Sequence, residues 1–313
     1  MLKVVISEFM DAAAIAAELG AFDTLYDPGL VDRPEALQAA VADADALIVR
    51  NRTQVHADLI AAAPHLKAIG RLGVGLDNID VAACSARGIT VFPATGANDG
   101  AVAEYVITAA LVLLRGAYGA TDRVAAGSWP RNALMGREIG GKRLGLVGFG
   151  AIARETARRA AAFGMEIAAH DPFLAADDPV WTAPYGPVAR RAFDALVAES
   201  DVLSLHVPLT DATRGLIDPD VLARMPRGAV LINAARGGVV DGAAVAAALR
   251  SGHLGGAALD VFDREPLNAD AGAVFVDVPN LILTPHIAGV TQESNVRVSA
   301  VTARAVRRHL TNH

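Results

Sequence analysis

The 313-residue sequence has one cysteine, Cys84, few aromatic side chains (5%) and no block of lysine and arginine. A single cysteine excludes an intrachain disulfide and a cluster of thiolate metal ligands, and it predicts a protein of the reducing cytoplasm. The sequence also lacks an HExxH metal motif, so we expect no metal site. Because the formal net charge is −6, nucleic acid is not an expected partner.

A long hydrophobic run is also missing. The most apolar stretch, AVAEYVITAALVLL, is interrupted by Glu104 and covers only residues 101–114. A membrane helix needs roughly 20 apolar residues, so we expect no membrane partner. The start, MLKVVISEFMD, lacks the basic and apolar regions of a signal peptide. The stretch instead predicts a helix over 99–119 that is buried between domains or subunits, and therefore a homodimer.

Apolar residues are plentiful, at 53% of the chain, and the length suits two domains. Short apolar runs alternate with alanine-rich helical stretches, which predicts an α/β protein with parallel sheets covered on both faces. The runs of the first series are 3–7, 22–26, 46–50, 66–72 and 88–92. The six runs of the second series are 143–148, 166–170, 201–207, 229–235, 256–262 and 281–286, as in a doubly wound nucleotide-binding domain.

A glycine-rich turn, LGLVGFGAIARE at 144–155, opens the second series. Gly148 makes the turn after a strand, and Gly150 lets the backbone approach a pyrophosphate at the start of a helix that begins with Ala151 and Ile152. Asp171 lies 18 residues beyond Ala153 (171 − 153), where a carboxylate accepts hydrogen bonds from the adenosine ribose. The pattern predicts NAD rather than NADP as the cofactor.

Polar residues follow four of the predicted apolar strands. They are His206, Arg236, Asp260 with Glu265 just beyond it, and His286. Ligands of open parallel sheets bind outside the carboxyl ends of the strands. These positions together supply a cation for a carboxylate, an imidazole, and a carboxylate to orient that imidazole.

The sequence resembles the D-isomer-specific 2-hydroxyacid dehydrogenase family along nearly its whole length. The resemblance is carried by NAARGGVVD (233–241), ALDVFDREPL (258–267), NLILTPHIAG (280–289), RLGVGLDNID (71–80) and HVPLTDATRGLI (206–217). It implies a flavodoxin-like substrate domain, formed by 1–98 plus 288–313, and an inserted Rossmann NAD domain at 99–287.

The resemblance also implies roles for individual residues. Arg236 would bind the substrate carboxylate, His286 would act as the general acid and base, and Glu265 would orient His286. Asp260 would hold the nicotinamide carboxamide, and Val74 and Gly75 would receive the substrate carboxylate. The remaining residues implied to line the cofactor are Val207, Pro208, Ala234 and Gly289.

The substrate depends on VRNRTQV at 49–55, at the end of one predicted strand, and on Arg71 at the end of the next. If two of Arg50, Arg52 and Arg71 face the substrate, a second anionic group such as a phosphate or sulfonate is favoured. The resemblance is nearest to the phosphoglycerate and (S)-sulfolactate dehydrogenase branches, with sulfolactate slightly preferred. Glycerate, hydroxypyruvate or glyoxylate remain alternative substrates.

Two alternatives of another kind share this fold. An NAD(H)-sensing regulatory or scaffold protein would have a broken Arg–Glu–His set or a long disordered tail, and the sequence has neither. An adenosylhomocysteine-type hydrolase would need a different set of catalytic lysine, aspartate and cysteine positions.

Overall fold

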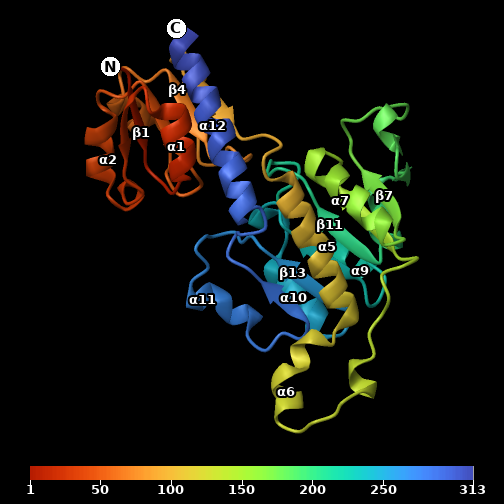
Figure 1. The fold of residues 1–313 in the computed structure, drawn as a ribbon. Helices are drawn as coiled ribbons and strands as arrows, with labels where there is room; N and C mark the ends of the chain where they lie inside the picture. The colour runs from red at the N-terminus through yellow and green to blue at the C-terminus, as the bar shows by residue number, and fades with distance from the viewer. Residues whose placement is uncertain (313) are drawn as a thin grey trace. The chain divides into compact units, whose positions relative to one another are not determined.

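The computed structural model describes residues 1–312, which form two compact units. The first unit comprises Met1–Asn98 and the residues from Val290 onward, and the second comprises Asp99–Gly289. The chain returns to the first unit between Gly289 and Val290, whereas the sequence pointed to a boundary between 287 and 288. Both ends of the chain therefore belong to the first unit (Figure 1).

The first unit contains a five-stranded parallel sheet in the order β2-β1-β3-β4-β5, the flavodoxin-like order. Its strands are β1 (Lys3–Ile6), β2 (Asp23–Tyr26), β3 (Ala46–Val49), β4 (Ala68–Arg71) and β5 (Thr90–Pro93). Its helices are α1 (Ala12–Leu19), η1 (Leu30–Asp32), α2 (Pro34–Val41), α3 (Ala57–Ala62), α4 (Val81–Ala86) and α12 (Gln292–Asn312).

Strands β3 and β4 are buried along their whole length, which explains why their sequences do not alternate between apolar and polar residues. One apolar cluster joins the sheet to α2, α3 and α4, and a second joins it to α1 and α12. Helix α12 lies directly on β4, because a Cβ at Gly70 would come within 2.6 Å of Thr302 and 2.9 Å of Val306. The last helix is thus part of the core of the first unit.

The second unit contains a seven-stranded parallel sheet in the order β10-β7-β6-β11-β12-β13-β14. Its strands are β6 (Arg143–Val147), β7 (Glu166–His170), β10 (Ala189–Arg190), β11 (Val202–Leu205), β12 (Val230–Asn233), β13 (Gly256–Leu259) and β14 (Leu281–Leu283). The first six strands in sequence have the Rossmann order 3-2-1-4-5-6, so the predicted class of two doubly wound domains is confirmed.

Helices and short segments surround this sheet. The longer helices are α5 (Asp99–Arg115), α7 (Ala151–Ala162), α8 (Phe193–Glu199), α9 (Pro219–Arg224) and α10 (Gly242–Arg250). The short ones are η2 (Tyr118–Ala120), α6 (Thr121–Ala125), η3 (Asn132–Leu134), η4 (Pro179–Trp181), η5 (Gly237–Val239), α11 (Ala269–Gly272) and η6 (Ala273–Phe275). An antiparallel hairpin of β8 (Thr182–Ala183) and β9 (Gly186–Pro187) precedes β10.

Two features differ from the sequence prediction. The sheet has seven strands rather than the six predicted. The additional strand is β10, which could not be recognised because it has only two residues and is defined by its pairing with β7. The helix predicted over 99–119 ends at Arg115, because Gly116 follows in the left-handed region with φ of 64°. Residues 116–136 then form an arm that contains η2, α6 and η3 and extends from the end of α5 (Figure 1).

Helix α5 packs against the main core of the second unit. Among the described residues, no single helix is long and apolar enough to span a membrane. Helix α5 and the segment Tyr118–Ala125 pass that test together by length and composition, with a bend of 63° between them.

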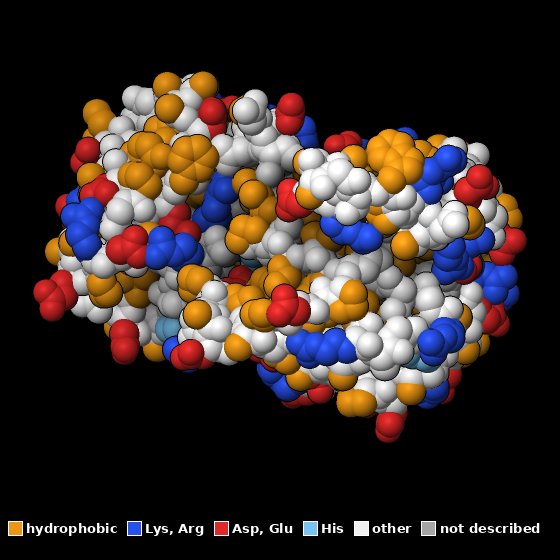
Figure 2. Space-filling model, turned by 90° about the horizontal axis from the view of Figure 1, so that it is seen from below, with side chains coloured by type: hydrophobic (Ala, Val, Ile, Leu, Met, Phe, Trp, Pro, Cys, Tyr) orange, Lys and Arg blue, Asp and Glu red, His pale blue; other side chains and the backbone are white. Residues whose placement is uncertain are grey.

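On the face shown in Figure 2, acidic and basic side chains are interspersed, so this face carries no large area of one charge.

Candidate active site

The glycine-rich turn between β6 and α7 leaves room for a ligand. Gly148 has φ of 86°, and a Cβ there would lie 2.6 Å from the carbonyl oxygen of His206. A Cβ at Gly150 would meet no other described atom within 4 Å, and within the described chain no side chain caps α7 there. The open space and the N–H groups at the start of α7, where Ala151 and Ile152 lie, fit a pyrophosphate.

Asp171 lies just beyond β7 and is tied to this turn. Its carboxylate accepts hydrogen bonds from the backbone N–H of Phe149 and from that of Phe173, each at 2.9 Å. Each carboxylate oxygen has a further lone pair. The carboxylate is therefore held beside the glycine-rich turn and can still accept hydrogen bonds from a ribose.

An aromatic stack supports the same turn, and sequence reasoning did not identify it. The rings of Phe149 and Trp181 are parallel to within 6°, with centroids 5.3 Å apart. Phe149 is fully buried, and Trp181 also donates from Nε1 to the carbonyl oxygen of Ala175 at 2.7 Å. The segment between β7 and β10 thus packs against the residue between the two glycines.

His286, Glu265 and Arg236 come together near the carboxyl ends of β12, β13 and β14. His286 Nδ1 lies 2.6 Å from Glu265 Oε2, and the two side chains are 35% and 31% exposed. Partial burial raises the pKa of Glu265, but hydrogen bonds from His286 and the Phe262 N–H outweigh it and lower the pKa below its usual value. The positive charge of Arg236 lowers the pKa further.

Glycine brings the loops that carry these residues into contact. A Cβ at Gly237 would collide with the carbonyl group of Phe262 and with the backbone nitrogen of Asp263. Only glycine therefore allows the turn after β12 to touch the turn after β13. The Phe262 N–H in turn donates to Glu265 Oε1 at 3.0 Å. This contact explains how Arg236 influences Glu265, 29 residues later (265 − 236).

Asp260 is buried, and its carboxylate is built into the turn that carries His286. Oδ1 accepts from Thr284 Oγ1 at 2.6 Å and from the Ile287 N–H at 2.8 Å, while Oδ2 accepts from the Ala288 N–H at 2.9 Å. These bonds to the turn are a feature that sequence reasoning missed. Val207 and Ala234 are partly buried just beyond the ends of β11 and β12, Gly289 is partly buried in the loop that follows β14, and Pro208 is exposed.

His206 is at a strand end as predicted, but it is not in contact with the His286–Glu265 pair. Its Nε2 lies 3.0 Å from Ser204 Oγ. Burial lowers the pKa of His206 to about 4, so its imidazole is neutral at pH 7.

The remaining predicted substrate residues belong to the first unit. Arg71 is buried at the end of β4 and donates from Nη1 to the Leu72 carbonyl oxygen at 3.0 Å. Val74 and Gly75 follow in the partly buried loop. Arg52 forms an exposed ion pair with Asp32. Among the described residues, no group of His, Cys, Asp and Glu has the arrangement needed to hold a metal ion.

Comparison with known proteins decides what this arrangement is. The family described as D-isomer specific 2-hydroxyacid dehydrogenase, NAD binding domain, matches residues 107–288. The (S)-sulfolactate dehydrogenase of Chromohalobacter salexigens is 55% identical over 99% of both chains. The chain belongs to the D-isomer specific 2-hydroxyacid dehydrogenase family. It is thus an NAD-dependent enzyme that transfers hydride between a 2-hydroxy acid and its 2-keto acid, which confirms the predicted family, cofactor and reaction class.

Other members of the family support the same assignment. D-3-phosphoglycerate dehydrogenase of Mycobacterium leprae is 42% identical over 88% of this chain, which spans only 52% of that protein. Two solved structures have the same fold. The TT0316 protein from Thermus thermophilus has a TM-score of 0.90 and 31% identity, with 100% and 98% of the two chains covered. D-lactate dehydrogenase from Aquifex aeolicus, complexed with NAD and lactic acid, has a TM-score of 0.87 and 28% identity, with 99% and 96% covered.

Proposed function

We propose that the substrate of this dehydrogenase is a 2-hydroxy acid with a second anionic group, (S)-sulfolactate before 3-phosphoglycerate. Two observations support the proposal: the 55% identity to a sulfolactate dehydrogenase along nearly the full length of both chains, and the arginines at the ends of β3 and β4. Glycerate or hydroxypyruvate, and glyoxylate, are the alternatives. A hydroxypyruvate reductase of Thermotoga maritima is 41% identical over 84% of both chains.

The catalytic residues in this proposal are Arg236, Glu265 and His286, and the contact between His286 and Glu265 is the observation that carries it. Glu265 engages Nδ1, so Nε2 is the nitrogen that faces the substrate oxygen. NADH, when bound, would supply the hydride that C2 of the keto acid accepts. In reduction His286 gives a proton from Nε2 to the C2 oxygen. Arg236 binds the substrate carboxylate through two parallel hydrogen bonds and polarises the C2 oxygen. In oxidation His286 takes the hydroxyl proton, and the carboxylate of Glu265 stabilises the resulting imidazolium.

The cofactor-binding residues in this proposal surround the glycine-rich turn. Gly148, Gly150, Ala151 and Ile152 would hold the pyrophosphate, and Asp171 would accept hydrogen bonds from the adenosine ribose. The residues proposed near the nicotinamide are Val207, Pro208, Ala234, Asp260 and Gly289. Oδ2 of Asp260 accepts the hydrogen bond from the Ala288 N–H and has a lone pair left for a carboxamide N–H.

The substrate residues proposed in the first unit are Val74 and Gly75 for the carboxylate and Arg52 and Arg71 for the second anion. The loop that carries Arg52 is held by Glu8, whose buried carboxylate accepts from the N–H groups of Arg50, Arg52 and Thr53 at 2.8, 3.2 and 3.0 Å. The ion pair between Arg52 and Asp32 is exposed, so an anionic ligand would displace Asp32 at a cost of about 1 kcal/mol or less.

Arg50 is a further candidate for the second anion. Its guanidinium lies 5.7 Å from the centre of the Phe9 ring and donates to Asn295. Its Nε is buried and has no hydrogen-bond partner among the described residues. Burial lowers the pKa of Arg50, although the charge of Glu8 opposes this effect. A bound anion would satisfy the Nε–H group and compensate the buried charge.

We further propose that the enzyme is a homodimer of the cytoplasm. The arm at 116–136 exposes Tyr118 (69%), Trp129 (76%) and Met135 (80%), and apolar surface of this kind is typical of subunit interfaces. A cytoplasmic location is supported by the single, buried cysteine. Light scattering that gives only a 32.3 kDa species would contradict the dimer.

The substrate is tested by NADH oxidation with sulfopyruvate, 3-phosphohydroxypyruvate, hydroxypyruvate, glyoxylate and pyruvate. Fast turnover confined to sulfopyruvate and 3-phosphohydroxypyruvate supports a substrate with a second anionic group. The KM values of Arg50→Met, Arg52→Met and Arg71→Met then show which arginine binds that group. A preference for hydroxypyruvate or glyoxylate contradicts the proposal of a second anionic group. NADH binding without turnover of any of the five favours a regulatory protein.

A further inference from the structure

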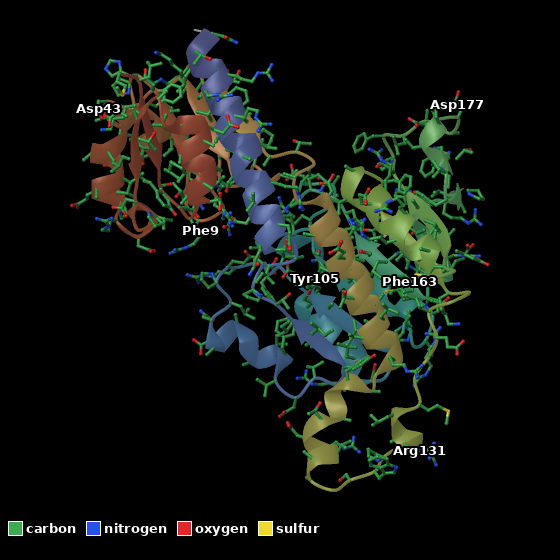
Figure 3. The ribbon with its side chains drawn as sticks, viewed as in Figure 1. Phe9, Asp43, Tyr105, Arg131, Phe163 and Asp177 are labelled. Atoms are coloured by element: carbon green, nitrogen blue, oxygen red, sulfur yellow. The ribbon has the colours of Figure 1, made fainter. Side chains whose placement is uncertain are left out.

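A chain of hydrogen bonds joins helix α5 to the turn that carries His286. Tyr105 is on α5, where Figure 3 labels it, and its Oη lies 2.7 Å from Thr284 Oγ1. Thr284 Oγ1 donates in turn to Asp260 Oδ1 at 2.6 Å. Tyr105 and Thr284 are 179 residues apart in the sequence, and both belong to the second unit.

The direction of these hydrogen bonds follows from the number of protons available. A threonine hydroxyl has one proton, and that of Thr284 is given to the Asp260 carboxylate. Tyr105 must therefore donate to Thr284 Oγ1. Burial raises the pKa of Tyr105 and outweighs the opposing effect of the hydrogen bond with Thr284, and the charge of Asp260 raises the pKa further, so the phenol keeps its proton.

The end of this chain holds an unfavourable backbone conformation. His286 has φ of 53°, which is uncommon for a residue other than glycine. The two oxygens of Asp260 accept from the N–H groups of Ile287 and Ala288, and the Asp260 carbonyl oxygen accepts from the His286 N–H at 2.8 Å. These bonds hold the N–H groups of His286 and of the two residues after it, and two of the three bonds depend on the orientation of the Asp260 carboxylate.

We propose that Tyr105 is a positioning residue for His286, acting through Thr284 and Asp260. The O–H group of Tyr105 orients the Thr284 hydroxyl, and this hydroxyl orients the Asp260 carboxylate. The carboxylate in turn holds the backbone around His286, so that Nδ1 of His286 contacts Glu265. This inference rests on the proposed role of His286 as the general acid and base. No atom of Tyr105 is required to touch the substrate or the cofactor.

The test compares Tyr105→Phe, Thr284→Val and the double variant with Tyr185→Phe, which removes the hydroxyl of another partly buried tyrosine of the second unit. We expect Tyr105→Phe to lower kcat by about tenfold, the effect of one lost hydrogen bond on the geometry of the acid. The KM for NADH should change by much less than kcat, since the glycine-rich turn stays intact and the carboxamide contact proposed for Asp260 is one of several contacts to the cofactor.

Two further results identify positioning rather than general stability. Thr284→Ser keeps the hydroxyl and should retain the wild-type kcat, whereas Thr284→Val should lower it at least as much as Tyr105→Phe. Because Tyr105 acts through Thr284, the double variant should be no slower than Thr284→Val alone. Losses that multiply in the double variant, or a wild-type kcat in Tyr105→Phe, would overturn the proposal.

A separate variant keeps this test distinct from that of the catalytic role. His286→Asn should lower turnover by about 10²–10⁴-fold with NADH binding retained. If it does so while Tyr105→Phe keeps the wild-type kcat, the positioning chain is wrong and the catalytic assignment stands. If His286→Asn remains active, the assignment of His286 as the general acid and base fails, and with it the premise of the positioning chain.

Discussion

Nδ1 of His286 lies 2.6 Å from Oε2 of Glu265. The two residues are on different turns, after β14 and after β13, and Glu265 is held by a second hydrogen bond from the Phe262 N–H. The contact therefore sets both the orientation of the imidazole and the nitrogen that carries the exchangeable proton.

Glu265→Gln should lower kcat by about a hundredfold in the reducing direction, because the neutral amide stabilises the imidazolium less. The pKa of Glu265 is below its usual value, so the wild-type carboxylate is charged throughout the neutral range. The measurement is kcat for reduction of the keto acid at pH 7, where the wild-type carboxylate is charged. Glu166→Gln, which removes an exposed charge paired with Arg143, is the control and should match wild type.

Asp171→Asn should weaken discrimination against NADP(H). The carboxylate repels a 2′-phosphate and accepts hydrogen bonds from the ribose, so we expect the KM for NADH to rise about tenfold, as for the loss of one good hydrogen bond. The asparagine oxygen still accepts from one of the Phe149 and Phe173 N–H groups. The measurement is the ratio of kcat/KM for NADH to that for NADPH, with Asp178→Asn in the same segment as control. An unchanged ratio would refute the assignment.

Trp181→Leu should weaken NADH binding with little change in kcat, because the glycine-rich turn loses the ring that packs on Phe149. A stacked aromatic pair contributes about 0.5–1.5 kcal/mol beyond its burial, so the Kd for NADH should rise roughly three- to tenfold. Trp181→Phe keeps an aromatic ring and should bind nearly as wild type. Equal affinity in the leucine variant, measured by titration calorimetry, would show that the stack only stabilises the fold.

His206 should make the second unit sensitive to acid. Its pKa falls from 6.5 to about 4 on folding, so below pH 6.5 the unfolded chain binds more protons than the folded one. Stability is therefore complete above pH 6.5 and decreases as pH falls towards 4, by at most about 3 kcal/mol.

The measurement is the free energy of unfolding in urea at pH 7 and at pH 5. The decrease between the two should be smaller in His206→Gln than in wild type. His65→Gln, at an exposed position, should show the wild-type decrease. A His206→Gln variant as acid-sensitive as wild type would contradict the buried neutral imidazole.

Much of the fold could be predicted because the interior strands are continuous apolar runs. Strands β3, β4, β11 and β12 are buried at every residue, and a burial pattern of this kind is visible in the sequence. Strand β10 could not be predicted, since Ala189–Arg190 has no apolar pattern and depends on its register with β7. The end of α5 was misplaced because the left-handed Gly116 competes with an alanine-rich sequence that favours continuation.

The positions of Arg236 and His286 just beyond the ends of apolar strands could be predicted from the sequence, whereas their catalytic roles stay predictions. Contacts between distant segments could not be predicted. Tyr105 looks like any apolar position of a buried helix, and only the folded chain brings its hydroxyl to Thr284. The same holds for Trp181 against Phe149 and for Glu8 under the loop of Arg52, where pairing depends on tertiary packing rather than on local pattern.

The most direct test of the central claim is a single-turnover measurement of NADH oxidation by His286→Asn, with the keto acid that the wild-type enzyme turns over fastest. The account predicts an unchanged Kd for NADH and a rate of hydride transfer lower by about 10²–10⁴-fold, the usual contribution of a general acid. A rate within about tenfold of wild type would show that another group donates the proton.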